Sequence, residues 1–210
     1  ITKEFKSVKH TYPMLSLGNT YSEDELRDFD ERVRKGLDHE YEYVCELKFD
    51  GVAIGLTYKE GKLVQAVTRG DGVQGDDVTA NVKTIRSIPL TLHGKNYPED
   101  FEIRGEILIA DRLLKNPRNA AAGTIKMQDS KVVGSRGLDC FLYAMYGKNL
   151  SFESHLDAMK AASTWGFKIS EHTKKCKSIE DVIKYLEHWD KARFDLPYDT
   201  DGVVIKVNSF

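Results

Sequence analysis

Several features that mark particular classes of protein are missing from this chain of 210 residues. No apolar run reaches the length of a transmembrane helix and no signal-peptide pattern is present, so the sequence does not indicate a membrane protein. Lys and Arg number 31 against 33 Asp and Glu, which gives a net charge of −2. A global basic field for nucleic acid is therefore absent, and any such contact requires a local patch or another part of a longer protein.

Cysteine pairs and the common nucleotide-binding loops are missing as well. Cys45, Cys140 and Cys176 are far apart and form no Cys-x-x-Cys pair, which argues against a zinc site. Cys45 and Cys140 lie in apolar, strand-like runs and are expected to be buried thiols, which fits a reducing cytoplasm. Neither Gly-x-Gly-x-x-Gly nor Gly-x-x-x-x-Gly-Lys occurs, which argues against a dinucleotide fold and a P-loop.

The composition is that of an ordinary globular protein. Hydrophobic residues make up 40% of the chain and charged residues 30%, and 210 residues suffice for one substantial core with or without a small appendage. We expect an N-terminal segment and helix over 1–40 that pack on a core over 41–210. The chain starts with Ile1 and ends directly after an apolar strand pattern, so we interpret it as a fragment of a longer protein.

The order of apolar and turn residues predicts an α+β fold. A capping box at Ser22–Glu25, followed by apolar residues at helical spacing, predicts a helix over 23–36, whereas residues 1–20 are expected to be irregular. Strands often meet at turns rather than alternating with helices, which favours mixed or antiparallel sheets flanked by helices. Strand patterns cover 42–58, 63–69, 101–109, 139–146 and 202–207, and helical patterns cover 78–84, 118–127, 152–165 and 178–192.

The motif with the most chemical content is Cys45–Gly51, which contains Lys-x-Asp-Gly. Lys48 ends an apolar run, where burial would lower the pKa of its amine and make it a nucleophile for a covalent phosphoryl intermediate. Asp50 and Gly51 would form a tight turn that brings the backbone close to a phosphate. The alternative is a plain hairpin turn at Asp50–Gly51 with an exposed lysine beside it.

Four further segments place polar residues at strand ends or in turns. Arg69 closes a strand before two glycines, and its alternative is a surface arginine. Glu106 lies between isoleucines and needs a partner or a ligand if it is buried. Lys206 shares a strand face with Val204, so it is expected to point inward towards an anion. The fourth segment, Asn116–Gly123, is expected to form a closely packed helix of small residues.

These residue types together favour nucleotidyl transfer. One lysine would be the nucleophile and a second would neutralise a phosphate, while carboxylates would hold ribose hydroxyls, a base edge or a divalent metal. Taken with their order, the motifs make the chain resemble the adenylation (nucleotidyltransferase) domain of bacterial NAD⁺-dependent DNA ligases. The matching segments are Pro13–Leu17, Cys45–Gly51, Thr68–Gly72, Gly75–Val82, Arg104–Glu106, Asn116–Gly123 and Leu196–Lys206.

The resemblance implies a role for each matching residue. Lys48 would attack the α-phosphate of NAD⁺ to give lysyl-AMP and release nicotinamide mononucleotide, with Asp50 assisting. Binding of NAD⁺ and its adenylate is assigned to Ser16, Leu17, Glu46, Arg69, Glu106, Asp201 and Lys206. The residues that resemble contacts to the DNA backbone are Arg118, Lys126 and Arg193; such contacts position a duplex without reading its sequence. No protein side chains are assigned as metal ligands.

The resemblance also implies cofactors and partners. These are NAD⁺, AMP as a covalent intermediate, Mg²⁺ or Mn²⁺, and nicked double-stranded DNA that is sealed in replication and repair of DNA damage. The setting would be a bacterial cytoplasm, without a membrane partner, and a monomer is the default expectation. The alternative is an ATP- or GTP-dependent lysine nucleotidyltransferase, namely an ATP-dependent ligase or a capping enzyme. A non-catalytic nucleic-acid-binding module is disfavoured by the net charge.

The chain departs from the family pattern in three ways. Lys126 stands where the family often has arginine, which keeps a phosphate contact but not a bidentate one. The segment from Gly105 to Asn116 is shorter than usual. Most of the N-terminal subdomain that holds nicotinamide mononucleotide, the last lysine motif and the other ligase domains are absent from the sequence. We therefore expect adenosine-like ligands to bind but nicks not to be sealed efficiently by this polypeptide alone.

Overall fold

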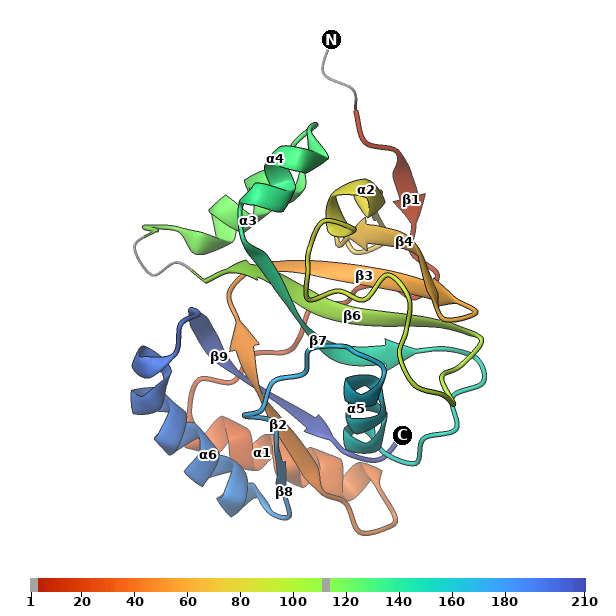
Figure 1. The fold of residues 1–210 in the computed structure, drawn as a ribbon. Coiled ribbons are helices and arrows are strands. Elements are labelled where there is room, and N and C mark those ends of the chain that lie inside the picture. Colours follow the sequence, from red (N-terminus) through yellow and green to blue (C-terminus); the bar gives the residue numbers. More distant parts are fainter. Residues whose placement is uncertain (1–3, 111–113) are drawn as a thin grey trace.

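Two antiparallel β-sheets lie face to face in the computed structural model, which describes residues 4–110 and 114–210, and helices cover their outer faces (Figure 1). A short ribbon of β1 and β5 lies beside them. The elements in chain order are β1 (Ser7–Lys9), α1 (Glu23–Gly36), β2 (Tyr43–Phe49), β3 (Val52–Lys59), β4 (Lys62–Thr68), β5 (Gln74–Asp76), α2 (Thr79–Val82), β6 (Asp100–Ile109), α3 (Pro117–Ile125), α4 (Ser130–Ser135), β7 (Leu138–Tyr146), α5 (His155–Thr164), β8 (Lys174–Cys176), α6 (Ile179–Ala192), a 3₁₀ turn (Arg193–Asp195) and β9 (Thr200–Val207).

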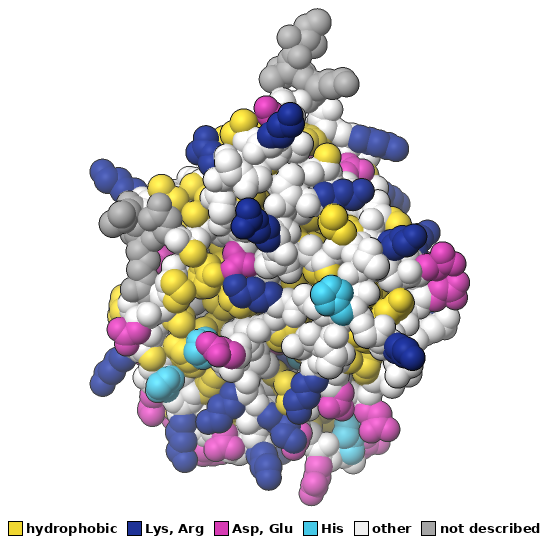
Figure 2. Space-filling view, viewed as in Figure 1, with side chains coloured by type: hydrophobic (Ala, Val, Ile, Leu, Met, Phe, Trp, Pro, Cys, Tyr) yellow, Lys and Arg dark blue, Asp and Glu magenta, His cyan; other side chains and the backbone are white. Residues whose placement is uncertain are grey.

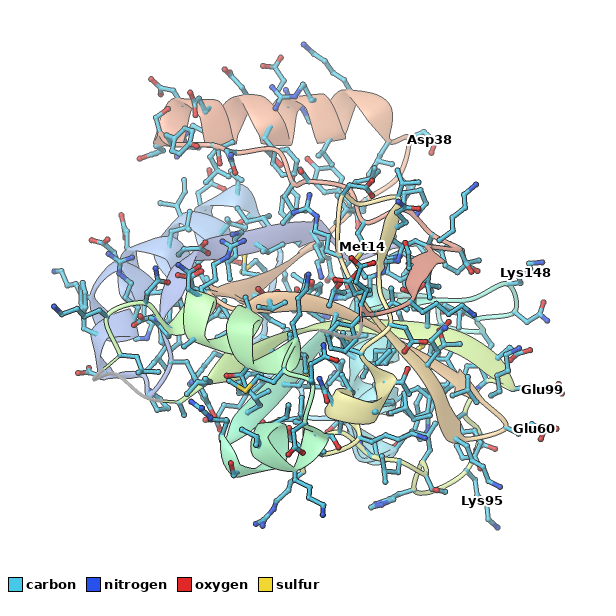
Figure 3. All side chains as sticks on the ribbon, turned by 90° about the horizontal axis from the view of Figure 1, so that it is seen from above. Met14, Asp38, Glu60, Lys95, Glu99 and Lys148 are labelled. Atoms are coloured by element: carbon cyan, nitrogen blue, oxygen red, sulfur yellow. The ribbon has the colours of Figure 1, made fainter. Side chains whose placement is uncertain are left out.

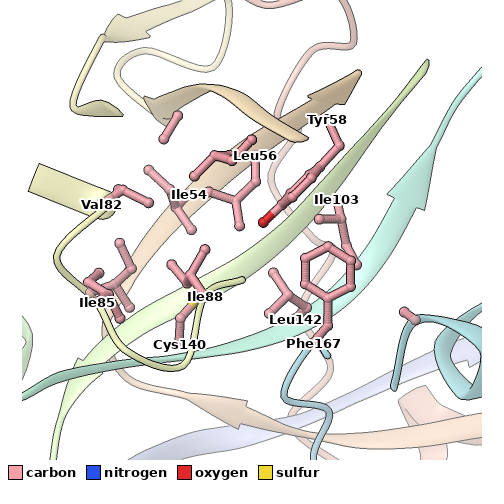
Figure 4. Packing of buried hydrophobic residues seen from close by; sticks show 14 of the residues in the cluster. Ile54, Leu56, Tyr58, Val82, Ile85, Ile88, Ile103, Cys140, Leu142 and Phe167 are labelled. Carbon is pink, nitrogen blue, oxygen red and sulfur yellow. The ribbon is translucent and has the colours of Figure 1, made fainter. Parts of the chain in front are cut away.

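The larger sheet has the strand order β4-β3-β6-β7 and carries the main core. One face of β3 and β6 presents Ile54, Leu56 and Ile103, which are fully buried. The side chains of Val82 and Ile85 pack on this face from α2 and the turn after it (Figure 4). Burial of aliphatic side chains contributes roughly 1.5–3 kcal/mol each, so this layer supplies much of the stability of the fold. The other face is left for the second sheet.

The smaller sheet has the order β8-β2-β9 and is covered by α1 and α6. Its apolar cluster joins Cys45 and Leu47 of β2 to Leu26 of α1 and Val182 of α6. The predicted capping box is present, because Ser22 accepts a hydrogen bond from the Glu25 N–H and α1 spans the predicted 23–36. Since the residues that alternate with Cys45 and Leu47 face the other way, Glu46 and Lys48 point towards the larger sheet.

The chain passes from one sheet to the other at Asp50–Gly51. The strand β2 pairs only with β8 and β9 among the described residues, and β3 pairs with β4 and β6, so the hairpin alternative for this motif is wrong. A Cβ atom at Gly51 would lie 2.2 Å from the carbonyl oxygen of Ile107, so only glycine fits where the backbone crosses β6.

The N-terminal segment is anchored on the larger sheet by Arg104. Its guanidinium donates hydrogen bonds to the carbonyl oxygens of Tyr12 and Pro13 and pairs with Glu102 at 3.0 Å. Met14 follows as a buried residue and lies towards the middle of the molecule in Figure 3, whereas Glu60 and other labelled polar residues lie near its periphery. This anchoring places Met14 next to Gly55 of β3 and Ser16 next to Arg69, the residue after β4.

The fold class and the long elements agree with those predicted from the sequence. The predicted strand over 42–58 is two strands, and residues 1–20, expected to be irregular, contain β1. Further elements not predicted are β5, α4, β8 and the 3₁₀ turn. The short segment between Gly105 and Asn116 includes residues 111–113, which lie outside the described residues.

The surface carries both signs of charge. Lys and Arg side chains are interspersed with Asp and Glu over the face in Figure 2, which agrees with the net charge of −2. Over residues 4–110 and 114–210, no helix is both long and apolar enough to cross a membrane.

Candidate active site

Lys48 is the penultimate residue of β2 and lies where the two sheets meet. Its Nζ atom donates to both carboxylate oxygens of Asp201 on β9, at 2.9 and 3.0 Å. The Lys48 side chain is 40% exposed, so the apolar surroundings expected from the sequence are not observed. Both oxygens of the Asp201 carboxylate thus engage the Lys48 amine. Any nucleophilic role for Lys48 therefore requires that it leave Asp201 and lose a proton once a substrate is bound.

The turn after Lys48 is held on two sides. The backbone N–H of Asp50 donates to the carbonyl oxygen of Asp199 at 3.0 Å. The Asp50 carboxylate lies 3.6 Å from the guanidinium of Arg118, near the start of α3. The structure thus brings together four of the predicted site residues: Lys48, Asp50, Asp201 and Arg118.

Glu106 joins this cluster from β6. Its Oε1 atom accepts a hydrogen bond from the Gly51 N–H at 3.2 Å. Burial raises the pKa of Glu106 to about 7, and the Gly51 N–H, Arg118 and Lys48 only partly oppose this rise. The carboxyl group of Glu106 is therefore able to hold or release a proton near neutral pH, beside the predicted nucleophile.

This raised pKa predicts a dependence of stability on pH. Between pH 4.5 and about 7 the unfolded chain releases the Glu106 proton while the folded chain keeps it, so stability falls as pH rises through this window. Relative to Glu106→Gln, which cannot titrate, the wild type should lose up to about 3 kcal/mol between these limits and then level off. Denaturant unfolding of both proteins from pH 4 to 8 measures the difference. A constant difference across the window would contradict the assignment.

Glu46 occupies a buried charge network rather than an open pocket wall. Its Oε1 lies 2.6 Å from His155 Nε2, and its Oε2 lies 2.7 Å from Lys206 Nζ, an ion pair outside hydrogen-bond angles. Burial alone would raise the pKa of Glu46, but His155 and Lys206 outweigh it and hold the pKa below its ordinary value. Lys206 also donates to the carbonyl oxygen of Tyr143 at 2.7 Å. The prediction that Lys206 points inward to an anion is confirmed, and that anion is Glu46.

Arg69 and Ser16 form a second pair near the N-terminal segment. The Arg69 guanidinium donates to Ser16 Oγ at 2.7 Å, and His10 bonds the Arg69 carbonyl oxygen at 2.9 Å. Leu17 beside them is 56% exposed. These residues are available to a ligand from the side of the anchored segment, and nothing in the described residues links them by a direct bond to Lys48.

The residues predicted to contact DNA are not clustered. Arg118 contacts Asp50 at one end of α3, and Lys126 pairs with Asp76 of β5 at 2.6 Å at the other end. The guanidinium of Arg193 lies 4.8 Å from the ring centre of Phe194, and its Nε is buried without a hydrogen-bond partner among the described residues. Of the three, only Arg118 contacts the cluster around Lys48.

Two residues of the site were missed by sequence reasoning. His155, the first residue of α5, contacts Glu46, and Arg104 anchors the segment that carries Ser16. A lone histidine after a capping serine gives no signal of a partner 109 positions away. Arg104 lies in a motif that we had singled out, but only tertiary structure reveals its partners.

Two antiparallel sheets meet beside Lys48, with Asp201 and the partly buried Glu106 at its side, and this arrangement fits an α+β nucleotidyltransferase domain. A model of the NAD-dependent DNA ligase adenylation domain family matches residues 2–210, and the chain belongs to this family. Within the described residues, no group of three or more His, Cys, Asp or Glu side chains is arranged to hold a metal ion.

Curated relatives agree with the family. A DNA ligase of Phocaeicola vulgatus is 55% identical over 224 residues, covering 100% of this chain and 34% of that protein. A DNA ligase of Cytophaga hutchinsonii is 53% identical over 223 residues, covering 99% and 33%. The chain thus spans about a third of the length of these relatives. An ATP-dependent DNA ligase from bacteriophage T7 in complex with ATP has a TM-score of 0.47 at 13% identity, covering 90% of this chain and 63% of that one, too weak a likeness to bear on function.

Proposed function

We propose that this chain transfers adenylate from NAD⁺ to its own Lys48 as the first step of DNA ligation. Lys48 Nζ forms a bond to the α-phosphorus, the phosphoanhydride bond breaks, and nicotinamide mononucleotide leaves with the bonding electrons. The amine loses its proton in the process. The adenylate then passes to the 5′-phosphate of nicked double-stranded DNA, and the nick is sealed by the longer protein.

The observation that carries this proposal is the cluster at the sheet junction. Lys48 and Asp201 are in contact, Glu106 is beside them with a pKa of about 7, and Arg118 adds a positive charge. An ammonium that is held by one exposed carboxylate can exchange this partner for a substrate phosphate. Lys206 lies on the same face of the sheet, and it would have to exchange its partner Glu46 before it could neutralise a phosphate.

Each predicted contact has a place in this mechanism. Ser16, Leu17 and Arg69 would hold the adenosine from the anchored segment. Glu46, which is paired with Lys206 and His155, would contact the adenine from β2. Arg118, Lys126 and Arg193 would contact the DNA backbone. Asp50 would help orient the phosphates.

A divalent cation fits the residues present. Mg²⁺ keeps several waters and uses one or two carboxylates together with substrate phosphates, and Asp50 and Asp201 near Lys48 offer such carboxylates. When bound, Mg²⁺ or Mn²⁺ would neutralise charge on the phosphates. We further propose a monomer in a bacterial cytoplasm, with a role in DNA replication and repair. A donor other than NAD⁺, namely ATP or GTP, is the alternative.

Calorimetric titration with AMP, NAD⁺ and GMP tests the nucleotide site. We expect AMP and NAD⁺ to bind while GMP does not, and Glu106→Ala to weaken adenine-nucleotide binding by about tenfold or more, since a buried polar contact is lost. Glu99→Ala is the matched control, because Glu99 is exposed and lies at the periphery of the molecule (Figure 3). Equal affinity for GMP, or equal losses in the two variants, would contradict this site.

A further inference from the structure

One group of contacts behind Lys48 is not used by the mechanism above. Along β7, the side chains of Asp139, Phe141 and Tyr143 alternate with the core residues Cys140 and Leu142. They therefore face the smaller sheet. Phe141 stacks on Phe49, the residue after Lys48, with ring centres 4.6 Å apart and planes within 9°. The strand β7 thus contacts the Lys-x-Asp-Gly motif through the stacking of Phe141 on Phe49.

The chain that leads into β9 and the start of β9 itself contact the same turn through three residues. The ring of Tyr198 meets Phe49 edge-on at 6.2 Å. The Asp199 carbonyl oxygen accepts the Asp50 N–H, and Asp201 binds Lys48 Nζ. Hence residues 198–201 set the position of the turn and of the lysine together.

Tyr198 is itself fixed by a charged pair, formed by Asp139 on β7 and Lys168 in the segment between α5 and β8. Its hydroxyl donates to Asp139 Oδ2 at 2.6 Å, and Lys168 Nζ bonds the same oxygen. Lys168 also lies over the ring of Phe141, 4.6 Å from its centre. Burial alone would raise the pKa of Asp139, but Lys168 and Tyr198 outweigh it and the pKa is lowered. Asp139 therefore accepts both bonds as a carboxylate.

We propose that Tyr198, Asp139 and Lys168 are positioning residues that hold Phe49 against Phe141 and so fix Lys48 for attack on a phosphate. This proposal rests on the proposed function of Lys48. It separates two tasks in the site: Glu106 and the anchored segment hold the nucleotide, whereas the Tyr198–Asp139–Lys168 cluster orients the nucleophile. Loss of the cluster should therefore slow the chemical step without weakening nucleotide binding.

The test is the first-order rate of lysyl-AMP formation at saturating NAD⁺, measured in single turnover with the full-length protein that carries this chain. Tyr198→Phe keeps the ring and removes the hydroxyl, and we expect about a tenfold slower rate because small displacements of a reacting group are costly. NAD⁺ affinity should stay within twofold. Asp139→Asn should slow the rate at least as much, and the double variant should be no slower than Asp139→Asn, since both act through one contact.

Tyr185→Phe is the matched control. The Tyr185 hydroxyl donates to the His172 carbonyl oxygen at 2.7 Å, a bond of similar length on α6 that does not involve the Lys48 turn. A wild-type rate in Tyr198→Phe, a loss no larger than in Tyr185→Phe, or a loss that appears only as weaker NAD⁺ affinity would overturn the positioning role. Absence of lysyl-AMP in the wild type would instead overturn the proposed function, and the two failures are thereby distinguished.

Discussion

Lys48→Ala is expected to abolish the covalent adenylate while adenine-nucleotide binding remains measurable. Lys48 is the only described lysine that lies at the sheet junction with Asp201, so no neighbouring amine can replace it. Removal of a nucleophile typically eliminates the covalent intermediate, because the remaining groups stabilise charge but form no bond. Intact-mass spectrometry after incubation with NAD⁺ and a divalent cation measures the result, since adenylation adds one AMP to the chain.

Two variants make the Lys48 experiment specific. Lys48→Arg keeps a positive charge next to Asp201 and should also form no adenylate, because a guanidinium is not deprotonated in proteins. Lys175→Ala removes an exposed lysine that pairs with Glu42 on the same sheet, and should adenylate as the wild type does. A stable adenylate on Lys48→Ala would show that another residue is the acceptor.

Among the substitutions proposed, Glu46→Ala is expected to cause the largest loss in the free energy of unfolding. Glu46 is only 5% exposed, and its carboxylate is shared between Lys206 and His155. Removing one partner of a buried pair leaves the other charge uncompensated, which typically costs about 3–5 kcal/mol. Denaturant unfolding of the wild type and of Glu46→Ala measures the difference in the free energy of unfolding, provided that this free energy depends on denaturant concentration with the same slope in both proteins.

Glu180→Ala is the control for Glu46→Ala that isolates the effect of burial on stability. Glu180 pairs with Arg27 at 3.1 Å, but its side chain is 60% exposed, so its removal should leave stability almost unchanged. Glu46→Gln keeps a hydrogen-bonding group and loses the charge, and should fall between the two. Similar midpoints for Glu46→Ala and Glu180→Ala would mean that the buried network contributes nothing net.

Local signals account for the parts of the fold that the sequence predicts well. The helix at 23–36 carries its own cap and apolar stripe, so both of its ends are encoded within about fifteen residues. The strands β1, β5 and β8 are three residues long, and each exists only because a distant strand pairs with it. Three residues are too few to show a periodic pattern of apolar and polar side chains, so the sequence does not predict such strands.

In the candidate site, too, features with a local sequence signal are predictable whereas contacts between residues distant in sequence are not. Lys48, Glu106 and Lys206 stand out in the sequence because polar residues in apolar strands are unusual, and each has a polar partner in the structure. The prediction of apolar surroundings for Lys48 was wrong, since Asp201, 153 positions away, replaces the expected apolar contacts. Likewise Asp139 and Lys168 gave no signal, because their importance arises only where β7 meets the segment before β9.

The passage of the chain between the sheets at Asp50–Gly51 has a mechanical consequence. This two-residue link joins β2 of the smaller sheet to β3 of the larger one. Two residues leave little freedom between the end of β2 and the start of β3, so the link fixes the two sheets to each other at this point. Because Lys48 is one residue from Phe49 at the link, its place relative to Glu106 of the larger sheet is set by covalent geometry as well as by side-chain packing.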